Sequence, residues 1–336
     1  MKPEVSFVSL TSFTTDLVTV LPITPIISAR VSRIIEYVTA YFLGLLVGFL
    51  GVFTNTVNIS VYLKMGLSET TNISFFALST SDLFISLSAV FVQFTFNRPL
   101  SLMLLPSGAP VSEIGMAACH IMYPSLACSA WITAALSIER CLCISMPLKV
   151  KDIFTPKRMI ILILAMVAYQ SVFIVLFFVS PGPPYDHYNA RRAFYYILSF
   201  SAPSLICFFL VLVSTTLLVI RLKQNLEWRK EATKQSNNRP GSSMKERKAA
   251  RSVVAICTIF IICFAPNVAL FVTSLFYPNV THHDPYLGSL MRILYSLSNI
   301  LQVLSSAVNI VIYYRMGTKY QEIIASLFYR QRVKKG

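Results

Sequence analysis

The stretch "MAACHIMYPSLACSAWITAALSIERCLCISMPLK", residues 116–149, decides the fold. From residue 116 to residue 138 it contains no Asp, Glu, Lys or Arg. A bilayer core of about 30 Å needs about twenty apolar residues when the chain is helical. The run is therefore long enough to cross a membrane as one helix, and Glu139 and Arg140 mark the point where charge returns.

The composition of the whole chain is that of a membrane protein. Hydrophobic residues make up 55% of the 336, mean hydropathy is +0.65 and only 13% of residues are charged, whereas about a quarter are charged in soluble domains. Helix-length apolar stretches occur at about 37–63, 72–94, 116–139, 158–180, 193–221, 250–276 and 288–314. None shows the alternation of a membrane barrel. We expect an all-α membrane protein, a seven-transmembrane helix bundle.

The basic residues predict the orientation of these spans. Most of the 29 Lys and Arg residues fall between spans one and two, three and four, five and six, and in the tail. Because basic loops stay in the cytosol, the N-terminus is expected outside the cell and the chain is expected in the plasma membrane as a multi-pass protein. The net charge of +15 indicates attraction to anionic lipid of the bilayer, and not a nucleic-acid partner.

Four regions follow from the hydropathy. Residues 1–36 are expected to form an extracellular N-terminal arm, and residues 37–314 the bundle. Within the bundle, residues 222–249 form a flexible third cytoplasmic loop with "QSNNRPGSS" near its centre. Residues 315–336 carry apolar side chains at helical spacing between charged ones. They predict a short amphipathic helix on the membrane surface, followed by a basic tail.

Asp82 is the only acid inside a span. An ionisable residue there is costly and marks a functional site by default. Two interpretations remain from the residues alone: polar contacts that hold helices together, or a hydrated cluster that binds a small cation such as sodium. We expect no other cofactor and no metal site. The polar residues at similar depth in other spans are Asn55, Ser129, Ser305, Ser306 and Asn309.

Prolines and cysteines add two structural expectations. Pro203 and Pro266 fall inside spans five and six, where each removes a backbone hydrogen bond and introduces a kink or hinge. Of the seven cysteines, only Cys119 lies near the outer face. An intramolecular disulfide outside the membrane is therefore not expected.

Four short motifs occur in a fixed order along the spans: "NISFFALSTSDL" with Asp82, "ERC" followed by Pro147, "FIICFAP" ending at Pro266, and "NIVIY" ending at Tyr313. In this order and spacing they resemble the motifs of the rhodopsin-like (class A) G-protein-coupled receptors, with Phe264 in the family's Trp position. The resemblance covers nearly all of the chain from the first span to the tail, and "ERCLCISMPLKVKDIFTPKR" further resembles molluscan chemosensory and orphan receptors. It implies an extracellular ligand, a heterotrimeric G protein and arrestin as partners.

The resemblance also implies a switch at the cytosolic end. Arg140 would be held by Glu139 at rest, with Glu246 as a second acid from span six, and would contact the G protein when released by movement of helix 6. Tyr313 would belong to the same switch. The hinge that moves helix 6 would be formed by Pro203, Phe260, Phe264 and Pro266.

By the same resemblance, the ligand pocket lies in the outer half of the bundle. Aminergic members carry an acid where Met122 stands, so a monoamine is not expected, and a chemosensory compound, a lipid or a neuropeptide remain. The chain departs from the family at Gly115, where the outer cysteine is missing, and at Ile310, which replaces a proline. The candidate pocket residues are Met122, Leu126, Phe264, Asn267, Asn299 and Val303.

A transporter or channel with seven spans is the alternative. It would need more charged pathway residues than Asp82 alone, and an enzyme would need a cluster of nucleophile, base or metal ligands that the sequence does not offer. The "NVT" sequon at Asn279 lies in the last outer loop. It is expected to be glycosylated.

Overall fold

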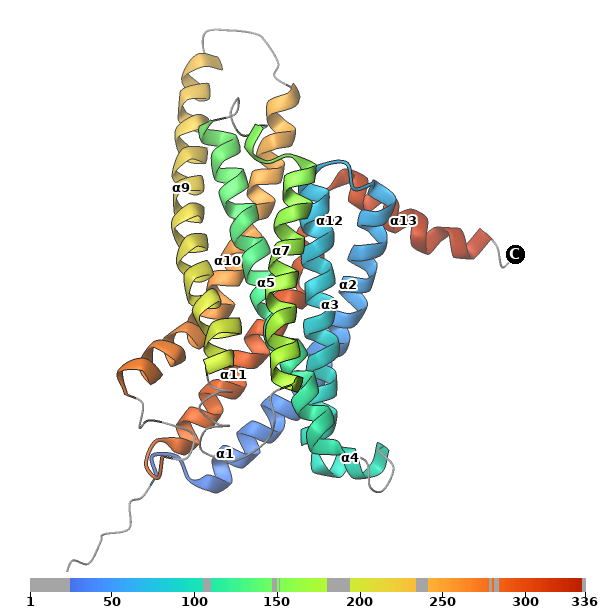
Figure 1. The fold of residues 1–336 in the computed structure, drawn as a ribbon. Coiled ribbons are helices and arrows are strands. Elements are labelled where there is room, and N and C mark those ends of the chain that lie inside the picture. The colour runs from blue at the N-terminus through green and yellow to red at the C-terminus, as the bar shows by residue number, and fades with distance from the viewer. Residues whose placement is uncertain are drawn as a thin grey trace, which may run out of the picture.

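The computed structural model describes residues 25–104, 110–146, 150, 152–179, 194–233, 241–277, 280 and 284–333. Within these ranges the chain is helical and has no strand. Seven of its helices are long and apolar enough to cross a membrane, and they stand side by side in one bundle (Figure 1). The predicted all-α seven-span bundle with a C-terminal helix is confirmed.

The helices can be followed along the chain in Figure 1. A π-helical segment, η1, joins α1 to α2 in the first span, and a second, η2, precedes α9 in the fifth. The elements are α1 (Ala29–Glu36), η1 (Tyr37–Leu43), α2 (Gly44–Met65), α3 (Thr70–Phe96), α4 (Arg98–Leu104), α5 (Val111–Ser145), α7 (Pro156–Val179), η2 (Ile197–Ser201), α9 (Ala202–Thr233), α10 (Gly241–Phe276), α11 (Gly288–Ala307), α12 (Asn309–Met316) and α13 (Thr318–Val333).

The first helix begins earlier than the hydropathy indicated. Residues 29–36, assigned above to the N-terminal arm, form α1, and Ser28 caps it by accepting a hydrogen bond from the Val31 amide at 3.4 Å. Hydropathy did not indicate this helix because it contains Arg30, Arg33 and Glu36. These charges are tolerated at the end of the bundle. At the connection predicted to be the third cytoplasmic loop, α9 ends at Thr233 and α10 begins at Gly241, so both helices extend into the predicted loop.

The third span, α5, lies at the centre of the bundle. Of its most apolar window 72% is buried, compared with 6% for α7, whose side chains face outward. Close packing elsewhere depends on small residues, as in other membrane bundles. At Gly48 of α2, an added Cβ atom would lie 2.8 Å from Val90 Cγ2 of α3. Ser137 and Ser214 join α5 to α9 through their hydroxyl oxygens at 2.6 Å.

Helix α13 leaves the bundle at the end opposite α1 and α4 (Figure 1). Its buried residue Tyr320 donates a hydrogen bond to Asn58 Oδ1 of α2 at 2.5 Å. The ring of Tyr320 also packs against Tyr62 and Tyr313, with centroids at 5.8 and 5.9 Å. The C-terminal helix is therefore fixed to the first and seventh spans at their ends opposite α1.

The seventh span is broken although it lacks the family's proline. Helix α11 ends at Ala307, Val308 forms a turn and α12 begins at Asn309. The Val311 amide bonds to the carbonyl of Val308 at 3.0 Å. Because α12 starts anew at Asn309, Ile310 lies in a first helical turn, where backbone N–H groups have no intrahelical acceptor.

Candidate functional site: an outer pocket, a polar core and an inner clamp

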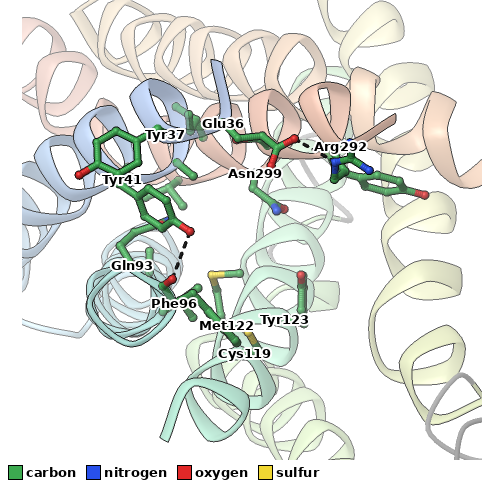
Figure 2. A pocket seen from close by; sticks show the side chains of 18 of the residues that line it. Glu36, Tyr37, Tyr41, Gln93, Phe96, Cys119, Met122, Tyr123, Arg292 and Asn299 are labelled. Atoms are coloured by element: carbon green, nitrogen blue, oxygen red, sulfur yellow. Dashed lines mark hydrogen bonds and ion pairs between the residues drawn. The ribbon is translucent and has the colours of Figure 1, made fainter. Parts of the chain in front are cut away.

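A cavity of about 580 Å³ opens between the first, second, third and seventh spans, toward the end of the bundle that carries α1 (Figure 2). This volume is typical of pockets that enclose small ligands. Its walls combine apolar, aromatic and charged side chains. The lining residues are Arg33, Glu36, Tyr37, Ala40, Tyr41, Gly44, Ala89, Val92, Gln93, Phe96, Cys119, Met122, Tyr123, Arg292, Tyr295, Ser296, Asn299, Ile300 and Val303.

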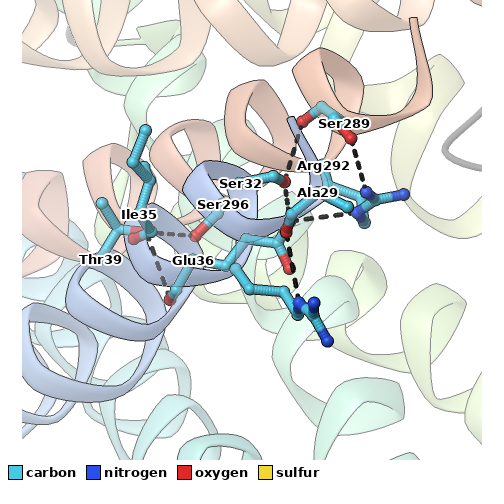
Figure 3. Close-up of polar contacts among 9 residues, drawn as sticks. Ala29, Ser32, Ile35, Glu36, Thr39, Ser289, Arg292 and Ser296 are labelled. Atoms are coloured by element: carbon cyan, nitrogen blue, oxygen red, sulfur yellow. Dashed lines mark hydrogen bonds and ion pairs between the residues drawn. The ribbon is translucent and has the colours of Figure 1, made fainter. Parts of the chain in front are cut away.

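The rim of this pocket is a polar seam between α1 and α11 (Figure 3). Arg292 Nε lies 3.1 Å from Glu36 Oε1, which also accepts a hydrogen bond from Ser32 Oγ at 2.6 Å. Arg292 Nη2 donates to Ser289 Oγ at 2.9 Å. The Glu36 and Arg292 side chains are only 27% and 36% exposed. The seam therefore joins the outer ends of the first and seventh spans in partly desolvated surroundings.

The π-helical turn η1 shapes the same wall. Thr39 Oγ1 donates to the Ile35 carbonyl at 2.7 Å and lies 2.8 Å from Ser296 Oγ of α11. Tyr41 lines the pocket and donates to the Phe96 carbonyl at 3.1 Å. A π-turn changes the helical phase by one residue and often occurs at functional sites. Here it lies between the charged rim and the apolar part of α2.

The expected pocket residues divide into three groups. Met122, Asn299 and Val303 line the pocket. Leu126 and Phe264 instead line a smaller, deeper cavity, and Asn267 lines neither of these cavities. The pocket thus lies toward the first and second spans, while Phe264 lines the deeper cavity and stacks on Phe260 with a centroid distance of 4.1 Å.

The charged rim residues were missed from sequence. Residues 29–36 had been assigned to an arm, so Arg33 and Glu36 were not considered as helical neighbours of Arg292. A usable signal existed: Arg292 is the one charged side chain within the seventh apolar stretch, at its outer end. A charge at such a depth requires a partner from another helix.

Asp82 lies at the centre of a polar core that joins three helices. Its side chain is 1% exposed. Asp82 Oδ1 accepts from Ser129 Oγ of α5 at 2.9 Å, and Oδ2 accepts from Asn309 Nδ2 of α12 at 2.8 Å. Asn55 does not bond to Asp82 directly, since its Nδ2 donates to the Ser306 carbonyl at 3.2 Å. The structure therefore assembles the predicted cluster, with Asn55 in its outer layer.

A cavity of about 10 Å³ adjoins Asp82, with Ser129, Ser305, Ser306 and Asn309 in its wall. That is room for about one water-sized sphere. Carboxylate and hydroxyl oxygens suit a hard cation such as sodium, so the donor set fits the predicted ion. Gln302 also lines the cavity. It is 1% exposed, and within the described part of the chain neither of its amide atoms has a hydrogen-bond partner.

The inner end of α5 forms a clamp that we define as Thr70, Thr71, Glu139 and Arg140. Glu139 and Arg140 are 2% and 9% exposed, with Oε1 and Nη2 3.1 Å apart. Thr70 Oγ1 donates to Glu139 Oε1 at 2.8 Å, and Arg140 Nη2 donates to Thr71 Oγ1. Both threonines begin α3, where the helix dipole favours a carboxylate.

Of the remaining predicted switch residues, the structure describes the side chain of Tyr313 but not that of Glu246. Tyr313 is buried, with its ring centroid 4.9 Å from Phe75 and 5.3 Å from Tyr62. The backbone of Glu246 lies in α10, but its side chain is outside the described residues. Pro203 and Pro266 lie within α9 and α10, and η2 ends directly before the turn that contains Pro203. The sequon at Asn279 is also outside the described residues.

A seven-helix bundle with an outer pocket, a buried acidic core and an inner Arg clamp defines a seven-span receptor. The family model described as "7 transmembrane receptor (rhodopsin family)" matches residues 54–313. The chain therefore belongs to the rhodopsin family of seven-transmembrane receptors, multi-pass proteins of the plasma membrane whose partners are an extracellular ligand and a G protein. This membership replaces the transporter and channel alternative. No match was found among curated proteins.

Proposed function

We propose that the receptor binds a chemosensory compound or a neuropeptide in the pocket behind the rim, and that binding releases Arg140 to a G protein through outward movement of α10. The observation that supports this most is that α5 connects the two sites. Met122 of α5 lines the pocket, Ser129 bonds to Asp82, and Arg140 lies in the clamp. The N-terminus is then extracellular, and arrestin would bind at the clamp end.

A monoamine ligand is disfavoured by the pocket itself. Met122 stands where an acid would be needed, and among the described lining residues Glu36 is the single carboxylate. Glu36 already accepts from Arg292 and Ser32. A cationic ligand would have to displace an existing ion pair to gain one.

A sodium ion beside Asp82 is part of this proposal. It would be held by oxygens of Asp82, Ser129, Ser305 and Ser306, and would neutralise a carboxylate that is buried without a cationic side chain among its hydrogen-bond partners. Sodium chloride should then raise the melting temperature of the purified receptor more than choline chloride does. Asp82→Asn should remove this difference, and a difference that persists in Asp82→Asn would place the ion elsewhere.

The ligand site can be tested with a panel of odorants, lipids and peptides in cells that express a promiscuous G protein. Met122→Trp and Val303→Phe fill the pocket and should abolish the response at equal surface expression. Leu164→Trp adds similar bulk on α7, where Leu164 is exposed on the outside of the bundle, and should leave the response unchanged. A response that survives both pocket substitutions would contradict the proposed site.

A further inference from the structure

Among the described residues that line the outer pocket, basic side chains outnumber acidic ones. Arg33, Glu36 and Arg292 are the charged residues that line it. Glu36 is engaged by Arg292 and Ser32, whereas Arg33 donates its Nε to the Ala29 carbonyl at 3.2 Å and forms no ion pair within the described part of the chain. Among the described residues that line the pocket, two guanidinium groups therefore accompany one carboxylate, which already accepts from Arg292 and Ser32.

The lining beyond these charges carries no ionised side chain among the described residues and is largely apolar, with Gln93 and Asn299 as polar members (Figure 2). Met122 and Val303 are each 5% exposed, and Ala89, Val92 and Ile300 line the same wall. Val303 follows Arg292 by eleven residues in α11, which places it about 16 Å further along the helix axis at 1.5 Å per residue. A ligand that spans this distance would be polar at the rim and apolar at the floor.

We propose that this pocket selects a small amphipathic carboxylate. Its carboxylate binds Arg33 and Arg292 at the rim, and its hydrocarbon body extends toward Met122 and Val303. Guanidinium groups bind carboxylates through paired, charge-assisted hydrogen bonds. A ligand amine would instead approach two like charges, and that repulsion excludes it. The inference rests on the proposed function, and it adds the chemical class of the ligand.

Glu36 has an unusual role under this proposal, because it competes with the ligand for Arg292. When a ligand carboxylate pairs with Arg292, the ion pair between α1 and α11 weakens. Neutralising Glu36 should therefore strengthen the binding of a carboxylate. In a pocket that selects cations, Glu36 would be the main binding group, and the same substitution would abolish binding.

The test uses the full-length receptor in nanodiscs and two matched probe series. Decanoate, decanamide and decylamine share one chain and differ in the head group, and phenylbutyrate is compared with its amide and its amine. We expect one or both carboxylates to bind and their amides and amines to bind at least about tenfold more weakly, the ratio for one lost charge-assisted hydrogen bond. Arg33→Gln should weaken carboxylate binding by about the same factor.

Two further variants separate recognition from general charge effects. Glu36→Gln should tighten carboxylate binding, and Arg30→Gln, on the same helix but outside the pocket lining, should leave it unchanged. Amine binding equal to acid binding, loss of acid binding in Glu36→Gln, or failure of both carboxylates to bind would each overturn the proposal. The cell assay with Met122→Trp and Val303→Phe tests the proposed function separately from the ligand class. If these variants abolish the response to any ligand of the panel, the pocket is the ligand site even when that ligand is not a carboxylate.

Discussion

Glu139 and Arg140 are neighbours in sequence and partners in space, yet their pairing is incomplete. Glu139 Oε2 and Arg140 Nε are buried and have no partner among the described residues. Leaving such groups unpaired costs about 1 to 3 kcal/mol each, and the hydrogen bonds of Thr70 to Glu139 and of Arg140 to Thr71 add to the ion pair. The contact between Glu139 and Arg140 was expected because the motif resembles that of the receptor family. The sequence could not predict the threonines, because only the packing of α3 against α5 brings them near.

Thr70→Val and Glu139→Gln should each raise basal G-protein signalling, because each removes a contact that keeps Arg140 in the clamp. Arg140→Ala should abolish coupling and leave ligand binding largely intact. Thr80→Val is the matched control, since within the described residues the Thr80 hydroxyl of α3 donates to its own helix, at the Phe76 carbonyl. Signalling would be measured at equal surface expression. Unchanged signalling in all three clamp variants would contradict the switch.

Gln302 offers a second test at single-residue scale. Its amide is buried without a partner in the described part of the chain, so Gln302→Met should raise the free energy of unfolding by about 1 to 3 kcal/mol. The melting temperature of the purified receptor measures this. A lower melting temperature would show that a water or ion bonded to the amide, as part of the cavity beside Asp82.

At the scale of elements, hydropathy predicted every span but misplaced the ends of several. The outer turn of the first span was read as an arm because its charges resemble those of a loop, and the π-turn η1 has no sequence signature. The break in the seventh span was also not predicted, since Ile310 replaces the residue that usually marks it. What sets it is tertiary: Asn309 begins α12 and bonds to Asp82 of α3.

The break leads to a prediction about proline. Ile310→Pro should fold and reach the cell surface, because a proline in the first turn of α12 removes no intrahelical bond. Leu301→Pro, in the middle of α11, should cost about 3 kcal/mol or more and reduce surface expression. Equal loss of both variants, measured by surface labelling, would show that α11 and α12 behave as one continuous helix.

Gly115 explains in part why the family's outer cysteine is absent. A Cβ atom there would lie 2.6 Å from Thr95 Oγ1 and 3.1 Å from the Phe96 ring, closer than side chains normally pack. Gly115→Ala should therefore destabilise the receptor by about 1 to 3 kcal/mol, seen as a lower melting temperature. Thr95→Ala in the same chain should restore part of the loss. Without that rescue, the close approach of α3 and α5 would not be the cause.

At the scale of the whole molecule, order and sidedness carried more information than any single motif. Asp82, Ser129 and Asn309 come from three separate stretches, and their meeting follows from similar depth in adjacent spans. The position of the pocket could not be predicted from the depth of residues in adjacent spans. It depends on side-chain packing between spans that are distant in sequence, such as the contact of Glu36 in α1 with Arg292 in α11.

The absence of a disulfide gives a prediction for the intact receptor. All seven cysteines are free thiols in the structure, so mild extracellular reductant and Cys119→Ser should both leave surface expression unchanged. Loss under both treatments would indicate a bridge between two receptor copies.

The orientation of the receptor in the membrane is tested separately. Asn279→Gln should remove a mobility shift due to glycosylation, and cytosolic labelling of residues 277–287 would contradict an extracellular N-terminus.

The seam also imposes an order on biosynthesis. Ser32 and Glu36 are among the first residues of the bundle to be translated, whereas Ser289 and Arg292 belong to the last span. Until that span is inserted, the Glu36 carboxylate has no Arg292 and the pocket has no fourth wall. A nascent chain that stops before the seventh span therefore carries the Glu36 carboxylate without its ion-pair partner, and the proposed ligand site is complete only once that span is in place.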